Sequence, residues 1–153
     1  MDIKVFNTAP VVEIDGVKYH HHANGGGMVA ERAQVDESAY IGPFAKICGC
    51  ARIKNNACVF GNAWVFDQAE VSENADVFGN AKVFGNARVR GDAKVLGFAS
   101  IYGNAIVSGD ADVRDKAEVG GDARVLGNAR VGGDTKVMGS ATVAPKIEVR
   151  RAA

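Results

Sequence analysis

The residues best suited to chemistry are three consecutive histidines near the start of the chain, His20, His21 and His22. In an extended strand His20 and His22 share one side, so this pair could chelate nickel or zinc, although no third ligand is indicated. An imidazole can also act as a general base when it lies within hydrogen-bond reach of the proton that it removes. The three histidines are therefore the candidate catalytic residues, and His20 and His22 form a weak candidate metal pair.

The cysteines do not follow a metal-binding pattern. Cys48 and Cys50 are separated by one residue instead of two, and no histidine follows them in the chain. This spacing and the missing histidine disfavour a zinc site, and together with Cys58 the cysteines make an odd number, which disfavours complete disulfide pairing. Unpaired cysteines are typical of a reducing compartment, so we expect a cytoplasmic protein.

Two acidic residues form a second weak metal candidate. Asp92 and Asp110 stand eighteen residues apart at equivalent places in a repeat described below, in a column with three asparagines. Carboxylates on adjacent coils could bind a hard cation such as Ca²⁺. The alternative is structural, because Asn and Asp tolerate the left-handed backbone angles that corners require.

A six-residue repeat runs without a gap from Val29 to Glu148. Its first position is Val or Ile in all twenty hexads, and its fifth is Ala in all but two, where Thr135 and Ile147 stand instead. The third position is Gly in 12 hexads, and the fourth is Asn or Asp in 11. Alternation of Ala and Val with variable residues predicts a strand with one buried face, and the Gly-Asn or Gly-Asp pair predicts a corner. Such units must stack to bury their apolar face, which predicts a solenoid.

The segments IGPFAKI (41–47) and VFGNAKVFGNARVRGDAK (77–94) resemble the hexapeptide repeat of left-handed parallel β-helix proteins. That family includes many acyltransferases, and the wording here is closest to short, regular bacterial and phage hexapeptide-repeat proteins. The resemblance implies an all-β fold of six to seven triangular coils, with three hexads and eighteen residues per coil. It also implies a homotrimer, because such proteins commonly pack side by side around a three-fold axis.

The outward residues of the repeat are unusually aromatic. Sorted by an eighteen-residue period, they fall on two adjoining faces and on the corner between them. Residues eighteen apart should stack as ladders, one on each face. The ladders and their neighbours comprise Phe44, Phe60, Trp64, Phe66, Phe78, Phe84, Leu96, Phe98 and Tyr102. Tyr40, Cys48 and Met138 flank them, and the third face is polar. Three interpretations are open: a protein–protein interface, cover by residues 1–28, or stacking within the chain alone. We expect the interface, with Phe44 and Phe98 near the trimer axis.

Three segments are expected. Residues 1–28 hold a hairpin at VEIDGVKYH (12–20), turned at Asp15-Gly16, and a linker through the histidines and glycines that could cap the first coil. Residues 29–148 form the β-helix, and residues 149–153 a C-terminal tail. Pro145 and the basic segment Val149-Arg150-Arg151 are expected to keep the exposed strand edge of the last coil from pairing with another chain.

Bulk composition narrows the function further. Net charge is zero, so the overall charge balance does not indicate a nucleic-acid-binding protein. No leader or membrane-spanning segment is evident in the sequence. Thr135 and Thr142 alone do not make the threonine ladder of an ice-binding protein. Opposite charges alternate down a column from Asp76 to Glu148, which would favour the correct register.

The sequence therefore favours a non-catalytic trimeric scaffold or protein-binding module without a cofactor. Such a protein could be a bacterial or phage assembly part or an inhibitor, in the cytoplasm or in a phage particle, with itself and possibly another protein as partners. The alternative is an acyltransferase-like enzyme that uses acyl-CoA and a base from His20–His22 in a groove between subunits. The repeat contains no histidine and no inserted loop that could wall such a pocket, which disfavours the enzyme.

Overall fold

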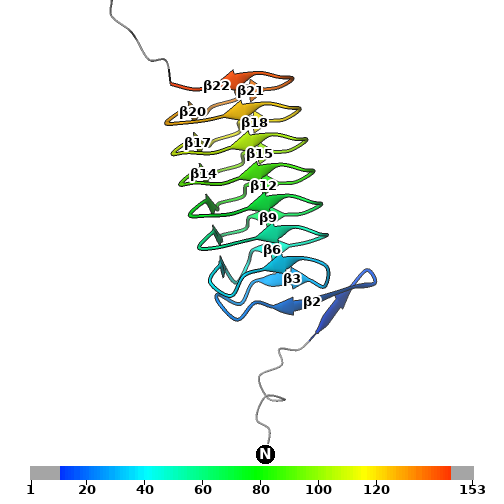
Figure 1. Cartoon of the computed structure of the whole chain (residues 1–153). Coiled ribbons are helices and arrows are strands. Elements are labelled where there is room, and N and C mark those ends of the chain that lie inside the picture. Colours follow the sequence, from blue (N-terminus) through cyan, green and yellow to red (C-terminus); the bar gives the residue numbers. More distant parts are fainter. Residues whose placement is uncertain (1–10, 146–153) are drawn as a thin grey trace, which may run out of the picture.

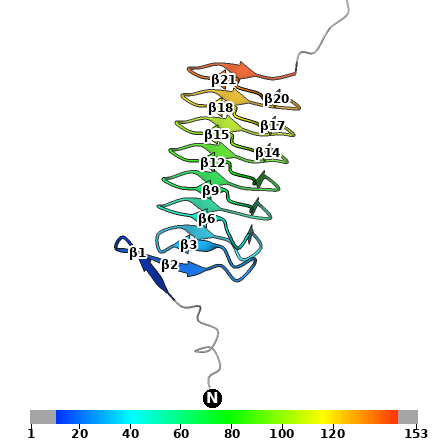
Figure 2. The ribbon, with the colours of Figure 1, turned by 180° about the vertical axis from the view of Figure 1, so that it is seen from behind.

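The computed structural model describes residues 11–145, which form a parallel β-helix with an N-terminal hairpin at its foot (Figure 1). Coils stack one above another from the first repeat strand to the last, and the opposite view shows the same column from behind (Figure 2). Within the described residues all regular elements are strands, as the repeat predicts. No helix in this part of the chain is long and apolar enough to cross a membrane.

Three sheets make the sides of the prism, and we call their outer surfaces face A, face B and face C. Sheet A contains the strands β1 (Val12–Ile14), β2 (Val17–His21), β3 (Met28–Ala30), β6 (Lys46–Ile47), β9 (Trp64–Val65), β12 (Lys82–Val83), β15 (Ser100–Ile101), β18 (Glu118–Val119) and β21 (Lys136–Val137). Sheet B contains β4 (Gln34–Val35), β7 (Arg52–Ile53), β10 (Glu70–Val71), β13 (Arg88–Val89), β16 (Ile106–Val107), β19 (Arg124–Val125) and β22 (Thr142–Val143). Sheet C contains β5 (Tyr40–Ile41), β8 (Cys58–Val59), β11 (Asp76–Val77), β14 (Lys94–Val95), β17 (Asp112–Val113) and β20 (Arg130–Val131).

Every first-position Val or Ile of the repeat lies in one of the twenty strands from β3 to β22. The chain runs from sheet A to B to C and returns to A one coil higher, so Lys82 pairs with Ser100 and Val83 with Ile101. Each parallel pairing joins residues eighteen apart, which confirms the predicted period of three hexads per coil.

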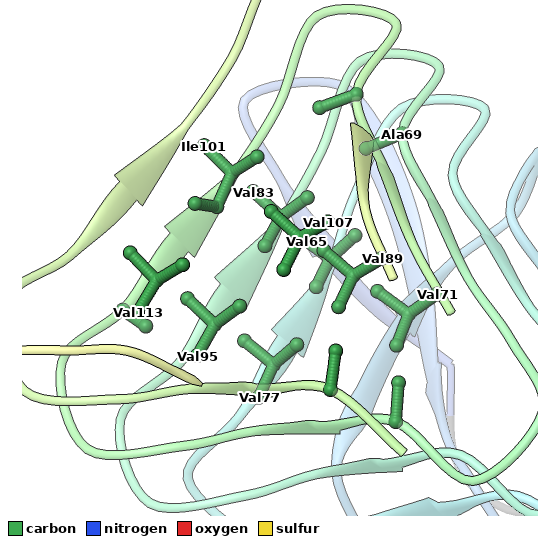
Figure 3. Close-up of a cluster of buried hydrophobic side chains, with 14 of the residues drawn as sticks. Val65, Ala69, Val71, Val77, Val83, Val89, Val95, Ile101, Val107 and Val113 are labelled. Carbon is green, nitrogen blue, oxygen red and sulfur yellow. The ribbon is translucent and has the colours of Figure 1, made fainter. Parts of the chain in front are cut away.

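The core is a narrow prism filled by the first-position Val or Ile and the fifth-position Ala of each hexad. From Ala39 to Val125 every one of these side chains has an exposed fraction of 0 or 1%. Figure 3 shows the resulting columns, in which Val65, Val83 and Ile101 stand in line. Small and β-branched side chains alternate here because a triangular coil leaves little room at its centre.

Corners owe their shape to the third residue of the hexad. All twelve third-position glycines have positive φ, and so do Asn55, Asp67, Glu73 and Asp115 at the same position. Each of these four side chains accepts a hydrogen bond from the backbone N–H one coil higher, for example Asp67 Oδ2 from Gly85 at 3.0 Å and Asp115 Oδ2 from Gly133 at 2.8 Å. The bond offsets part of the strain of a left-handed non-glycine residue.

The N-terminal hairpin is confirmed. Its turn has φ of 52° at Asp15 and 79° at Gly16, as a two-residue hairpin turn requires. Strand β2 pairs antiparallel with β3, so the hairpin extends sheet A by two strands beyond the first coil. The linker is shorter than predicted, because His20 and His21 belong to β2.

The loop after β2 covers a second sheet edge. The N–H of Gly27 donates to the carbonyl of Ile41 at 3.0 Å, and the N–H of Ile41 donates to the carbonyl of Asn24 at 3.0 Å. The segment therefore satisfies backbone groups of β5 at the start of sheet C, which supports its predicted capping role.

At the other end, the ring of Pro145 lies over the corner at Gly127, where a Cβ on that glycine would meet the proline Cδ at 3.0 Å. The end of the last predicted hexad, with Ile147 and Glu148, and the tail at 149–153 lie outside the described residues.

Candidate functional site

Two stacks of aromatic rings stand on adjoining outer faces of the β-helix. On face A the rings of Phe66 and Phe84 have centroids 4.8 Å apart and planes within 2°, and Tyr102 continues the stack at 5.3 Å. On face C Phe60 and Phe78 stack in the same way, at 4.8 Å and 2°. Both ladders are as the eighteen-residue spacing predicts, because the ring spacing equals the spacing of strands in a sheet.

Stacking changes how much of each ring meets water. The five ladder rings and Leu96 are half-buried, because each covers part of its neighbour. Among the described residues, the most exposed aromatic side chains are Phe44 at 75% and Phe98 at 62%, followed by Trp64 at 39%. The apolar surface therefore concentrates away from the ladder centres.

Phe44 and Phe98 both project from the corner between faces C and A, three coils apart. Between them this corner carries Asn62 and Asn80, so four successive coils present uncharged corner residues. A shallow hollow of about 230 Å³ beside Phe44 is lined by Phe44, Lys46, Asn62, Ala63 and Trp64. We call this surface, from Phe44 to Phe98 with Trp64, the aromatic corner.

Trp64 is held from both neighbouring coils. The ammonium groups of Lys46 and Lys82 lie 5.6 Å and 5.9 Å from its ring centroid, and Phe66 packs at 5.4 Å with a 54° tilt. The indole N–H donates to the sulfur of Cys48 at 3.1 Å. The indole is thus preorganised, and part of its ring stays open to a partner.

Cys48 also links the hairpin to face A. The hydroxyl of Tyr19, on β2, donates to the Cys48 sulfur over 3.7 Å, and this hydrogen bond, aided by burial, raises the pKa of Tyr19. The sequence placed Cys48 beside the aromatic residues but not Tyr19, which lies outside the repeat. The eighteen-residue spacing of Lys46, Trp64 and Lys82 was a signal that could have revealed the lysine pair around the indole.

The three histidines do not share one site. His22 is buried at the foot of the core, and its Nε2 lies 2.9 Å from the carbonyl oxygen of Ala39. His21 Nδ1 lies 2.8 Å from the carbonyl oxygen of Gly26. Because a carbonyl only accepts, each of these nitrogens carries a proton and donates it. His20 is exposed beside a hollow of about 180 Å³, lined by Val11, Lys18, Tyr19, His20 and Glu31.

No metal cluster accompanies these candidates. Over residues 11–145 no three or more His, Cys, Asp or Glu side chains lie close enough together to hold a metal ion. Asp92 and Asp110 are exposed and stacked at the corner between faces B and C. The structural explanation offered for them was wrong in detail, because positive φ belongs to Gly91 and Gly109, one residue earlier in each corner.

The charge columns are in the predicted register but make few ion pairs. Asp76 faces Lys94, and Lys94 faces Asp112, on adjacent coils of face C. Among the described residues the ion pairs within 4.0 Å are Lys54–Glu70, Arg114–Asp112 and Lys136–Glu118. Asp112 thus pairs with Arg114, the residue directly after its strand β17, and such exposed pairs stabilise by only ~0–1 kcal/mol each.

No family model, curated protein or solved structure matches this chain.

Proposed function

We propose that this chain is a non-catalytic scaffold or protein-binding protein that associates with itself as a homotrimer. The aromatic corner lies near the three-fold axis, and face A of one copy adjoins face C of the next. The observation that carries the proposal is the exposure of Phe44 and Phe98, 75% and 62%, at one corner of an otherwise regular prism. The proposed location is the cytoplasm, which the three free cysteines support, or a phage particle, which rests on the sequence resemblance alone.

The energetics favour burial of this corner. Removing a phenylalanine side chain from water stabilises by ~1.5–3 kcal/mol, and cyclic symmetry brings the same corner of three copies together. Rigid β-helix faces lose little conformational entropy on association, which lowers one of the costs that this gain must exceed.

The other two corners of the prism are less suited to lie at the three-fold axis of the proposed trimer. The corner between faces B and C carries several acidic residues, Glu37, Glu73, Asp92 and Asp110. Three copies of that corner would bring like charges together. The corner between faces A and B also carries charges, Asp67 and Asp122 among them. The aromatic corner is uncharged over four coils and avoids this repulsion.

The histidine geometry favours binding over catalysis. A general base needs a free nitrogen facing a substrate pocket. One ring nitrogen each of His21 and His22 already donates to a backbone carbonyl, and His20 borders only a small hollow. The acyltransferase alternative would need a second copy to build its acyl-CoA groove around these residues.

Light scattering coupled to gel filtration tests the proposal. The wild type should have a mass of about 48 kDa, three times the 16.0 kDa chain. Phe44→Ser/Phe98→Ser should shift the mass to that of a monomer with an unchanged circular dichroism spectrum. The control, Ile106→Ser/Leu126→Ser, removes two apolar side chains from face B and should remain trimeric. A monomeric wild type at micromolar concentration would refute the proposal.

A further inference from the structure

A groove of about 420 Å³ lies along the corner between faces A and B, away from the aromatic corner. Its lining comes from three successive coils: Cys50, Arg52, Gln68, Glu70, Asn86 and Arg88. A second hollow, of about 450 Å³, shares three of these residues and continues across the corner, lined by Gly49, Cys50, Asp67, Gln68, Gly85 and Asn86.

The groove has two guanidinium groups without an acidic partner. Arg52 and Arg88 stand one coil below and one coil above Glu70 in the same column. Glu70 is engaged by Lys54, whose Nζ lies 3.6 Å from its carboxylate. Within residues 11–145 neither arginine lies within 4.0 Å of a carboxylate. An incoming anion would therefore meet two available guanidinium groups beside an acid that already has a cation.

The remaining lining groups add hydrogen-bond donors. Gln68 and Asn86 each carry an amide NH₂ group with two donors, and both border the groove from the corner side. Arginine presents a planar fork of donors that matches a carboxylate in two-point contact. The chemistry of the groove thus fits an anionic ligand with more than one oxygen pair.

The dimensions fit an extended peptide. Arg52 and Arg88 are two coils apart, which is roughly 9.6 Å at the usual strand spacing. Alternate side chains of an extended strand lie about 6.8 Å apart, and the long arginine side chains can close the difference.

A nucleic acid fits less well. The groove lining contains no aromatic side chain on which a base could stack.

We propose that this groove binds an acidic, extended segment of a partner protein, with carboxylates on alternate residues reaching Arg52 and Arg88. The site goes beyond the proposed self-association and uses a different part of the surface. In a trimer built on the aromatic corner, the groove lies at another corner of the prism, so binding here and trimer formation can be tested separately.

Fluorescence anisotropy with a labelled peptide tests the site. The probe carries three glutamates on alternate residues separated by serines, and a matched peptide carries glutamines instead. The wild type should bind the glutamate peptide at low salt and release it as salt is raised. Arg52→Gln/Arg88→Gln should weaken binding at least tenfold. Arg90→Gln/Arg124→Gln removes the same charge from face B outside the groove and should change affinity less than twofold.

Three results would overturn the proposal. These are no binding by the wild type, an equal loss in the two double variants, and tighter binding of a short single-stranded oligonucleotide than of the peptide. The first two would exclude a specific site, and the third would assign the groove to nucleic acid. Light scattering on the same samples measures the mass, and so shows whether the trimer forms independently of whether the peptide binds.

A second measurement needs no substitution. Cys50 is exposed in the groove, whereas Cys58 lies on face C. The glutamate peptide should slow alkylation of Cys50 by iodoacetamide, followed by mass spectrometry, and leave Cys58 unchanged. Equal rates at Cys50 with and without saturating peptide would contradict the proposed site.

Discussion

The indole N–H of Trp64 donates to the sulfur of Cys48 over 3.1 Å, and the hydroxyl of Tyr19 approaches the same sulfur at 3.7 Å. One thiol thus joins the hairpin, the coil that contains β6 and the coil above it. Trp64 is the single tryptophan of the chain, so its emission reports on this contact.

Cys48→Ala removes the acceptor for both donors. We expect a loss of about 1 kcal/mol in the free energy of unfolding, because a net hydrogen bond stabilises by roughly that amount. The emission of Trp64 should also shift to longer wavelength as the indole gains water contact. Chemical denaturation and fluorescence measure both effects, and Cys48→Ser, which keeps an acceptor, should restore most of each. Identical emission in wild type and Cys48→Ala would show that the contact does not position the indole.

The positive φ at the third position of the hexad predicts that two substitutions of Gly79 will destabilise the protein unequally. This residue has φ of 70°, and a Cβ there would lie 2.9 Å from the backbone nitrogen of Gly97. Gly79→Val should therefore cost about 2 kcal/mol or more of unfolding free energy. Gly79→Asp should cost about 1 kcal/mol or less, because Asp67 and Asp115 occupy the same position and accept from the next coil. Urea unfolding compares the free energies of unfolding of the two variants, and equal losses would contradict this prediction.

Cys58 should respond to the charge of Asp76. Burial raises the pKa of the Cys58 thiol, and the neighbouring Asp76 carboxylate raises it further. A raised pKa means less thiolate at a given pH, so alkylation of Cys58 should be slow at pH 8 and accelerate as pH rises. Asp76→Asn should lower the pKa and speed alkylation at pH 8. Asp112→Asn, two coils away in the same column, is the control and should leave the rate unchanged.

The core should tolerate a change in side-chain shape better than the introduction of a polar group. Val83 is fully buried between Val65 and Ile101 in one column. Val83→Ile adds one methylene to a packed column, and it should cost only about 1 kcal/mol, at the low end of the range for overpacking, because the column already accommodates isoleucine at Ile101. Val83→Thr has similar volume but buries a hydroxyl among apolar side chains, at about 1–3 kcal/mol. Thermal unfolding measures the midpoints of both variants, and a midpoint of Val83→Thr no lower than that of Val83→Ile would contradict this prediction.

Much of the fold could be predicted from the repeat because the same pattern of residues predicts a strand and a corner in each hexad. A Val or Ile at the first position and an Ala at the fifth predicted which side chains of each strand lie inside, and the period predicted the stacked Phe66, Phe84 and Tyr102. The corner residue was partly missed. Gly and Asn or Asp both tolerate left-handed angles, and only the backbone geometry shows that the glycine takes them.

The surface was harder to predict because exposure depends on neighbours from other coils. Spacing placed Phe44 and Phe84 in the same apolar set, yet Phe84 is half-buried by its stacked neighbours while Phe44 is 75% exposed. The burial of His22 likewise depends on the loop that turns it toward Ala39, and no periodic signal describes that loop.

By itself, the sequence determined the strand pattern, the composition of the core and the columns in which outward residues stack. These follow from local alternation and a constant period, which need no knowledge of distant contacts. Only the tertiary structure decided which apolar groups remain open, that Lys46 and Lys82 flank Trp64, and that Arg52 and Arg88 border one groove. Those relations depend on side-chain directions and distances between coils, which the order of residues leaves undetermined until the chain is folded.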